Sequence, residues 1–452
     1  MAPNPRPHES HSGDGGRSGD GGRSGDGGRA AKQSRATNVW RSGNALLVVA
    51  LVVMAVNLRP GATSIGPVLS ELKQDLGLSD TIAGLLTALP GLGFAIVGAF
   101  AATIGARLGL SRALTLALGI VGVGLLGRVF AVEAAGFLAL TSLVITGMAV
   151  GNVLVPPFIK ANFGLHTARM TSVYTVAMAI GATLPALLTG WLVTLPGGWR
   201  AALGIWGGTA VLALIPWFAV VVRERRNGRR AEPVPVPVPV SPAASSSRKN
   251  PRRMTDFLRS RTAVALAIFF GTQSMHAYVS FGWLTQAYRD GGLDATSSAL
   301  MLAILLAFGI PTGLVMPLIV GRVRDLRPVV VTLGLSSFLG FLGILCFPTT
   351  LPWLWVVLLG ISSAAFPTAI ALITVRTRDH RVTMEVSAFV QSTGYLLAAA
   401  GPFLVGVTLD VFGTWHVPLL ALSASGIVLA IVGVIVVSGP VIDDELGAPR
   451  VP

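Results

Sequence analysis

Residues 44–69 read NALLVVALVVMAVNLRPGATSIGPVL, and this stretch decides the fold. Arg59 is its only charged residue. A helix needs about 20 apolar residues to cross the hydrocarbon core of a bilayer, and this run is long enough. The stretch therefore predicts a membrane-spanning helix that starts near Asn44.

Eleven further apolar stretches of similar length follow along the chain. Backbone groups in lipid must hydrogen-bond within their own segment, so we expect all twelve stretches to be α-helices. The predicted spans are 44–69, 80–104, 112–131, 135–159, 168–194, 199–222, 262–287, 295–319, 328–347, 351–374, 384–409 and 415–438.

The segments outside the spans divide the chain into two halves. Residues 1–43 carry SGDGGR three times, starting at Ser12, Ser18 and Ser24, and a tail with so little to bury is expected to be disordered. Residues 223–261 combine basic runs with PVPVPVPV, which favours an extended linker. We therefore predict an all-α integral membrane protein with twelve transmembrane helices in two pseudo-symmetric six-helix bundles, 44–222 and 262–438, with a short tail at 439–452.

The basic residues predict the orientation of the chain in the membrane. The chain is 52% hydrophobic and 12% charged, with a formal charge of +14. With the N-terminus placed inside, 29 of the 34 Lys and Arg residues fall in inside segments and three fall outside. This asymmetry predicts cytoplasmic termini and a multi-pass plasma-membrane protein. Charges that recur at every second loop also argue against nucleic acid as a partner.

The sequence lacks the common signatures of enzymes and metal sites. Its one cysteine, Cys346, allows neither an intrachain disulfide nor a thiolate metal set. No CxxC, HExxH, GxxxxGK or GxSxG sequence is present. We therefore expect no enzymatic activity, no cofactor and no metal. The expected partners are a small-molecule substrate, the lipid bilayer and a coupling proton or counter-anion, and we expect a monomer.

Arg59 is the first candidate for substrate binding. It lies about 22 Å along its helix from Asn44, near mid-membrane, where an ionisable side chain marks a functional site by default. Pro60 removes a backbone donor and Gly61 loosens the turn, so we expect the helix to break beside the guanidinium. Its donors suit a planar anion. The alternative is an arginine that snorkels outward or pins a neighbouring helix.

The seventh span offers Gln273, His276 and Tyr278. His276 lies at a depth of about 21 Å, similar to that of Arg59, so in a pseudo-symmetric pair of bundles both would face one cavity. The alternative is a histidine that only hydrogen-bonds a neighbouring helix. No acidic residue lies at mid-membrane, so a coupled proton would have to travel on His276 or on the substrate.

Further polar residues and helix breaks occur at matching places in the two halves. Asn152 precedes Pro157 in the fourth span, and Pro367 interrupts the tenth. Paired proline-interrupted helices are typical of transporter binding sites. In the eleventh span, Gln391 and Tyr395 can bind a polar solute or join two helices. Arg128, at the outer end of the third span, is predicted to snorkel or to act in gating.

Several motifs point to a known family. They are Asn57–Gly61 in the first span, Gly147–Pro156 in the fourth, Met170–Tyr174 in the fifth, Gly198–Trp206 in the sixth, Phe366–Pro367 in the tenth, and Gln391–Tyr395 with Gly401–Pro402 in the eleventh. With these motifs the chain resembles a major facilitator superfamily transporter, and within that superfamily the CynX/NimT group of cyanate-permease and nitroimidazole-transporter-like proteins. The resemblance covers about residues 40 to 438.

The resemblance implies a secondary transporter that works by alternating access, and it adds Asn57 to the substrate-binding candidates. It also places gating residues in two short loops. The loop after the second span contains Arg107 but lacks the acidic residue usual in the family, whereas the loop after the eighth span keeps one, Asp325.

Our leading hypothesis is a transporter of a small anionic or weakly acidic solute, similar to cyanate, with Arg59 as the coordinating cation. A second hypothesis is an exporter of nitroimidazole-like or other small drug molecules, in which Tyr278, Gln391 and Tyr395 make the main contacts. More remote alternatives are a transporter-like membrane sensor and an intramembrane enzyme.

Overall fold

The computed structural model describes residues 45–226 and 254–447. These residues form helices joined by short loops, and no strand occurs among them. The predictions for the SGDGGR tail and the PVPVPVPV linker lie outside the described residues. At the edges of the linker, helix α8 continues to Arg226 and a short 3-10 helix, η4 (Met254–Arg259), precedes the seventh span.

The first half contains six spans. The first is helical over residues 45–57 and continues as α2 (Pro60–Thr63), η1 (Gly66–Val68) and α3 (Leu69–Leu76), so it ends seven residues later than predicted. The other five are α4 (Asp80–Leu108), α5 (Leu110–Gly127) with η2 (Arg128–Phe130), α6 (Ala134–Phe163), α7 (Thr167–Leu192) after η3 (Gly164–His166), and α8 (Gly198–Arg226).

The second half also contains six spans. They are α9 (Arg261–Asp290), α10 (Ala295–Ala307) with α11 (Gly309–Arg322), α12 (Arg327–Cys346), α13 (Pro352–Ser362) with α14 (Ala365–Val375), α15 (His380–Phe412) and α16 (His416–Ser438). A short helix, α17 (Ile442–Gly447), follows within the segment predicted to be a tail.

Eleven helical stretches in the described residues are long and apolar enough to cross a membrane. One of them, Ala134–Leu192, has 59 residues, and as one straight helix it would extend roughly 90 Å, about three times the thickness of a bilayer core. It contains α6 and α7, which the turn η3 separates. The stretch therefore supplies two spans, and the predicted fold of twelve transmembrane helices is confirmed.

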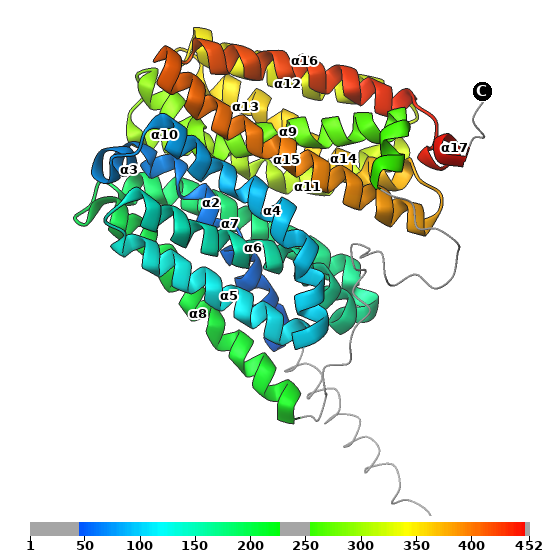
Figure 1. Ribbon diagram of the computed structural model, residues 1–452, viewed down its shortest axis with the longest axis horizontal. Helices are drawn as coiled ribbons and strands as arrows, with labels where there is room; N and C mark the ends of the chain where they lie inside the picture. Colours follow the sequence, from blue (N-terminus) through cyan, green and yellow to red (C-terminus); the bar gives the residue numbers. More distant parts are fainter. Residues whose placement is uncertain (1–44, 227–253, 448–452) are drawn as a thin grey trace, which may run out of the picture. The chain divides into compact units, whose positions relative to one another are not determined.

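The halves meet along two seams, the α4–α15 seam and the α7–α10 seam. Within the first half α5 packs on α6 and α8, and within the second α9 packs on α15 and α12 on α16. Figure 1 shows the blue-to-green helices of the first half beside the green-to-red helices of the second. A binding site on the inner faces of α4, α7, α9 and α15 is therefore shared by both halves.

Close backbone approach holds the α4–α15 seam together. A Cβ atom on Gly84 of α4 would lie 2.8 Å from the carbonyl oxygen of Pro402, and one on Gly91 would lie 3.0 Å from the Cβ of Ala399. Real Cβ atoms are hardly ever this close to another atom, so only glycine allows the two helices to pack at this distance. Small residues at such contacts are typical of helix pairs in membranes.

Proline does not break every helix in which we predicted a break. Span one is interrupted at Leu58 and Arg59, and span ten at Ser363 and Ala364, three residues before Pro367. By contrast, α6 continues through Pro157 to Phe163. The predicted break at Pro157 is therefore wrong, because neighbouring groups in a packed bundle can satisfy the backbone groups that a proline frees.

Candidate functional site

Arg59 lies in the gap between two helical pieces of span one. The first piece ends at residue 57, and α2 begins at Pro60 with Arg59 as its N-cap residue. The Arg59 carbonyl accepts hydrogen bonds from the backbone N–H groups of Ala62 and Thr63 at 3.0 and 3.1 Å. The backbone around Arg59 is therefore fixed, and its side chain projects from a non-helical turn in the middle of the span.

The Arg59 side chain is partly exposed and has few protein partners. Its Nη2 donates to the Met178 sulfur atom, a weak acceptor, at 3.4 Å. Among the described residues Arg59 takes part in no ion pair. Most of its donors are therefore available to a ligand, and its charge is uncompensated.

Three of the chain's four tyrosines lie close enough to Arg59 to interact with its charge. Tyr174 of α7, Tyr278 of α9 and Tyr395 of α15 all lie within electrostatic range of the guanidinium. These helices belong to both halves, so the two halves converge on the arginine. We call Arg59 and these three tyrosines the central cluster.

Aromatic rings form one wall of the central cluster. The rings of Tyr278 and Tyr395 stack with centroids 6.3 Å apart and an interplanar angle of 29°. Phe94 of α4 and Phe270 of α9 lie 5.6 and 5.1 Å from the Tyr395 ring. A planar ligand is well suited to such a wall, since aromatic faces favour offset stacking.

Asn152 joins the central cluster through Tyr174. The Tyr174 hydroxyl donates to Asn152 Oδ1 at 3.3 Å, while Asn152 Nδ2 donates to the Met148 carbonyl one turn earlier at 2.9 Å. Asn152 is partly exposed. Its amide therefore orients the Tyr174 hydroxyl, and the second N–H of Nδ2 remains for a further acceptor.

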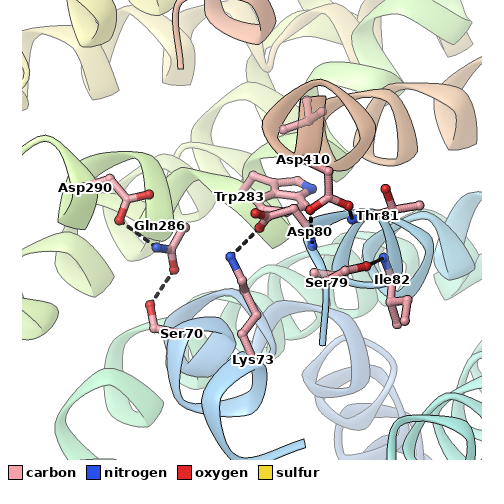
Figure 2. A network of polar contacts seen from close by, with 12 residues as sticks. Ser70, Lys73, Ser79, Asp80, Thr81, Ile82, Trp283, Gln286, Asp290 and Asp410 are labelled. Atoms are coloured by element: carbon pink, nitrogen blue, oxygen red, sulfur yellow. Dashed lines mark hydrogen bonds and ion pairs between the residues drawn. The ribbon is translucent and has the colours of Figure 1, made fainter. Parts of the chain in front are cut away.

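Polar contacts join the two halves at the end of the bundle that contains α3, which we call the α3 end (Figure 2). Asp410 of α15 accepts hydrogen bonds from the backbone N–H groups of Asp80 and Thr81, at 3.0 and 2.7 Å, at the start of α4. Arg289 of α9 pairs with Glu71 of α3 at 2.9 Å. The halves are therefore closed against each other at the α3 end.

At the opposite end, the contacts of α17 stay within one half. Glu445 accepts hydrogen bonds from the Thr262 hydroxyl and backbone N–H, at 2.9 and 3.2 Å. Asp443 accepts from the backbone N–H groups of Arg378 and Asp379, at 3.0 and 3.2 Å. Among the described residues, these contacts tie α17 to the start of α9 and to the segment just before α15, both in the second half.

Residues 45–383 match the profile described as Major Facilitator Superfamily. The chain belongs to the major facilitator superfamily. As a member of this superfamily it is a multi-pass membrane transporter and not an enzyme.

Three relatives support the resemblance to the CynX/NimT group. The chain is 33% identical over 390 residues to the uncharacterized transporter YycB of Bacillus subtilis (strain 168), which covers 86% of this chain and 92% of the relative. It is 29% identical to the 2-nitroimidazole transporter of Escherichia coli (strain K12), covering 88% and 96%. It is 27% identical to the cyanate transport protein CynX of the same strain, covering 82% and 91%.

A solved structure supports the fold alone. The crystal structure of a D-xylose–proton symporter has a TM-score of 0.64 to this transporter, at 14% identity, and covers 87% of this chain and 95% of the other.

His276 of the seventh span does not face the central cluster, and Gln273 of the same span hydrogen-bonds within α9. His276 is buried inside the second half, where its Nε2 lies 2.6 Å from the Ser425 hydroxyl and its Nδ1 lies 3.0 Å from the Ser337 hydroxyl. Gln273 Nε2 donates to the Phe270 carbonyl at 3.0 Å and to the Ser274 hydroxyl. The prediction that His276 faces one cavity with Arg59 is therefore wrong, because its ring points to α12 and α16 of its own half.

Asn57 also makes its contacts away from the cluster. It is buried, its Nδ2 donates to the Val53 carbonyl at 2.8 Å, and its Oδ1 accepts from Thr209 of α8 at 3.0 Å. Gln391 is partly exposed one turn before Tyr395 on α15, and it donates to the Ser387 hydroxyl at 2.7 Å. Asn57 thus links span one to α8, whereas Gln391 stays near the cluster.

The two predicted gating residues, Arg107 and Asp325, lie exposed near the α17 end. Asp325 accepts from the backbone N–H of Arg327 at 3.0 Å, at the start of α12. Arg107 lies in the last turn of α4 in the first half. Neither residue joins the central cluster.

Arg128 does not snorkel as predicted. Its side chain is completely buried and donates to the Gly61 carbonyl at 3.2 Å and to the Ser64 hydroxyl at 3.0 Å. The guanidinium therefore turns inward to span one, because the interruption of that span provides acceptors there.

Sequence reasoning missed the apolar members of the site. Phe94, Phe270 and Met178 each touch the central cluster, but apolar residues are common throughout every span and carry no distinguishing pattern. Tyr174, in contrast, was marked by the sequence, since it ends the Met170–Tyr174 motif and is the one tyrosine of the first half.

Proposed function

We propose that this transporter moves a small anionic or weakly acidic solute, similar to cyanate, across the plasma membrane, with Arg59 as the coordinating cation. The observation that carries the proposal is the uncompensated guanidinium of Arg59 at the meeting point of both halves. A charge at mid-membrane is costly unless it serves a ligand or a partner. An anion would supply the missing partner.

The central cluster fits alternating access. Tyr174 lies in the first half and Tyr278 and Tyr395 in the second, so a solute bound to Arg59 touches both halves and its binding responds to their rocking. With the termini in the cytoplasm, as the basic residues favour, the closed α3 end faces outward. The site then opens to the cytoplasm. We further propose that a monomer is sufficient, because one chain supplies the whole cluster.

Proton coupling, if present, runs through the substrate itself. Acidic side chains such as Asp80 and Asp410 lie at helix ends, and Glu385 pairs with Arg381 at 3.0 Å. His276 has both ring nitrogens engaged by serines away from the cluster. A weak acid that binds as the anion and carries its own proton, or exchange against a counter-anion, needs no protein carboxylate.

A second candidate is export of nitroimidazole-like solutes. The observation that favours it is the aromatic wall, in which Phe94, Phe270 and Tyr278 all lie within 6.3 Å of the Tyr395 ring. Such a wall binds a flat heterocycle by stacking without needing a charge.

Uptake into proteoliposomes separates the two candidates. Arg59→Ala and Arg59→Lys are compared with wild type for cyanate and for 2-nitroimidazole, with Arg112→Ala as a matched control because Arg112 is exposed at the start of α5. We expect both Arg59 variants to lose cyanate uptake and Arg112→Ala to keep it. Full cyanate uptake by both Arg59 variants contradicts the proposal. If wild type takes up no cyanate but transports 2-nitroimidazole, and the Arg59 variants transport 2-nitroimidazole equally well, the second candidate is favoured.

A further inference from the structure

Arg128 carries a buried charge that takes no part in the central cluster. Its guanidinium is 0% exposed, and its Nε has no hydrogen-bond partner. No described acidic residue pairs with it. The nearest ring is Phe137, whose centroid lies 5.9 Å from the Arg128 Cζ. Burying an unpaired charge is expensive, so a function must retain it.

The acceptors of Arg128 belong to the interrupted part of span one. In a continuous helix the Gly61 carbonyl would accept from the Ile65 N–H, but that N–H points to the Ala62 carbonyl at 3.5 Å. Arg128 Nη1 supplies the missing donor at 3.2 Å. Its Nη2 donates to the Ser64 hydroxyl, which in turn donates to the Pro60 carbonyl at 2.5 Å. The side chain therefore satisfies the Gly61 carbonyl of the short helix α2 directly and binds the hydroxyl that serves the Pro60 carbonyl.

Helix α6 packs closely against the same side of α2. A Cβ on Gly61 would overlap the side chain of Val144 and would lie 2.7 Å from the Met148 sulfur atom of α6. On its other sides α2 packs against α7 and α9. Arg128 and α6 thus hold one side of α2, while Arg59, directly before α2, projects to the tyrosines of α7, α9 and α15.

We propose that Arg128 is a positioning residue for substrate binding: it holds the interrupted turn of span one so that Arg59 projects into the central cluster. This inference rests on the proposed role of Arg59. Because Arg128 is fully buried, it cannot touch a solute and acts only through span one. A neutral side chain would leave the Gly61 carbonyl without a donor in an apolar surrounding, so the interrupted turn would shift and Arg59 would no longer be held toward the central cluster.

The first test needs no substrate. In a Cys346→Ser background, Arg59→Cys is combined with wild-type Arg128, Arg128→Lys or Arg128→Gln, and labelling by an impermeant thiol reagent is followed in proteoliposomes. We expect Arg128→Gln to slow labelling at position 59 about tenfold and Arg128→Lys to slow it less. Met178→Cys on α7 is the matched control, and its labelling should not change. An unchanged labelling rate at position 59, or no labelling there with Arg128 intact, overturns the inference.

The second test separates positioning from folding. Cyanate uptake is measured for Arg128→Lys, which keeps the positive charge, and for Ser64→Ala, which keeps the Arg128 guanidinium. Positioning predicts a several-fold rise in KM with kcat nearly unchanged, whereas a merely structural role lowers the amount of active protein and leaves KM as in wild type. Unchanged KM in both variants overturns the inference. If Arg59→Ala retains cyanate uptake, the proposed function fails, and the labelling result still decides whether Arg128 holds the turn.

Discussion

Asp410→Asn tests whether the contacts at the α3 end hold the two halves closed. The Asp410 carboxylate accepts from two backbone N–H groups at the start of α4, those of Asp80 and Thr81, at 3.0 and 2.7 Å. Asparagine has a similar shape but offers one acceptor oxygen and no charge. The change therefore removes one bond across the seam and the favourable interaction of a negative charge with a helix N-terminus.

The size of the effect follows from these two contributions. A hydrogen bond to a charged group contributes about 1.5–3 kcal/mol, and a carboxylate near a helix N-terminus contributes about 0.3–1 kcal/mol. Because the two contributions overlap, we take about 1.5–3 kcal/mol for both. At about 1.4 kcal/mol per factor of ten, the ratio of open to closed α3 ends should rise roughly 10- to 100-fold.

Thiol labelling at position 87 reports this opening. Thr87 is 5% exposed and lies on α4 against Gly282 of α9, so it becomes accessible only when the halves part at the α3 end. The free cysteine, Cys346, is exposed and is first changed to serine. Thr87→Cys is then labelled from outside intact cells with an impermeant reagent. Asp410→Asn should raise the labelling rate at least tenfold.

Asp443→Asn is the matched control. Asp443 also accepts from two backbone N–H groups, those of Arg378 and Asp379 just before α15, but it does so within the second half. The Asp443→Asn variant should leave the labelling rate at Thr87→Cys unchanged. Equal labelling in Asp410→Asn and in the parent would refute the reasoning that this carboxylate holds the halves together.

Two further predictions concern other polar contacts. Glu71→Arg places a second positive charge opposite Arg289 and should raise the labelling rate at Thr87→Cys. The double exchange Glu71→Arg with Arg289→Glu should restore the parent rate. Failure of the double variant to restore that rate argues against a direct pair. His276→Ala leaves the buried Ser337 hydroxyl unpaired and should lower the free energy of unfolding by about 1–3 kcal/mol, measured by thermal unfolding. The KM for cyanate should stay within about twofold of wild type. A large rise in KM would instead place His276 in the binding site.

The fold was predictable because membrane spans have a simple requirement. A bilayer demands about 20 apolar residues for each helix, and the twelve predicted stretches satisfy it. The interruption at Arg59 was predictable for a local reason too, because Pro60 removes a donor and a charge follows an apolar run. The boundary of span one was missed, since the amphipathic α3 continues it past the apolar run.

The position of a residue along its helix could be predicted from the sequence, but the direction in which its side chain points could not. His276 and Tyr278 lie at nearly the same depth on α9, yet two residues correspond to about 200° of rotation around a helix. Tyr278 therefore reaches the central cluster while His276 points to α12 and α16. Because α9 is buried on almost all sides, its sequence has no polar face that shows which side lines the cavity.

Arg128 was misplaced for a related reason. A guanidinium near a helix end usually reaches for water, and that preference guided the prediction. The acceptors that hold it, the Gly61 carbonyl and the Ser64 hydroxyl, lie 67 and 64 residues away in sequence. Only the packing of span one against α6, next to η2, brings them together.

Equilibrium binding of cyanate to purified Arg59→Gln tests the central claim most directly. Loss of one hydrogen bond to a charged donor, worth about 1.5–3 kcal/mol, should raise the Kd roughly 10- to 100-fold while the protein stays folded in thermal unfolding. A Kd equal to that of wild type would contradict the role of Arg59 as the coordinating cation.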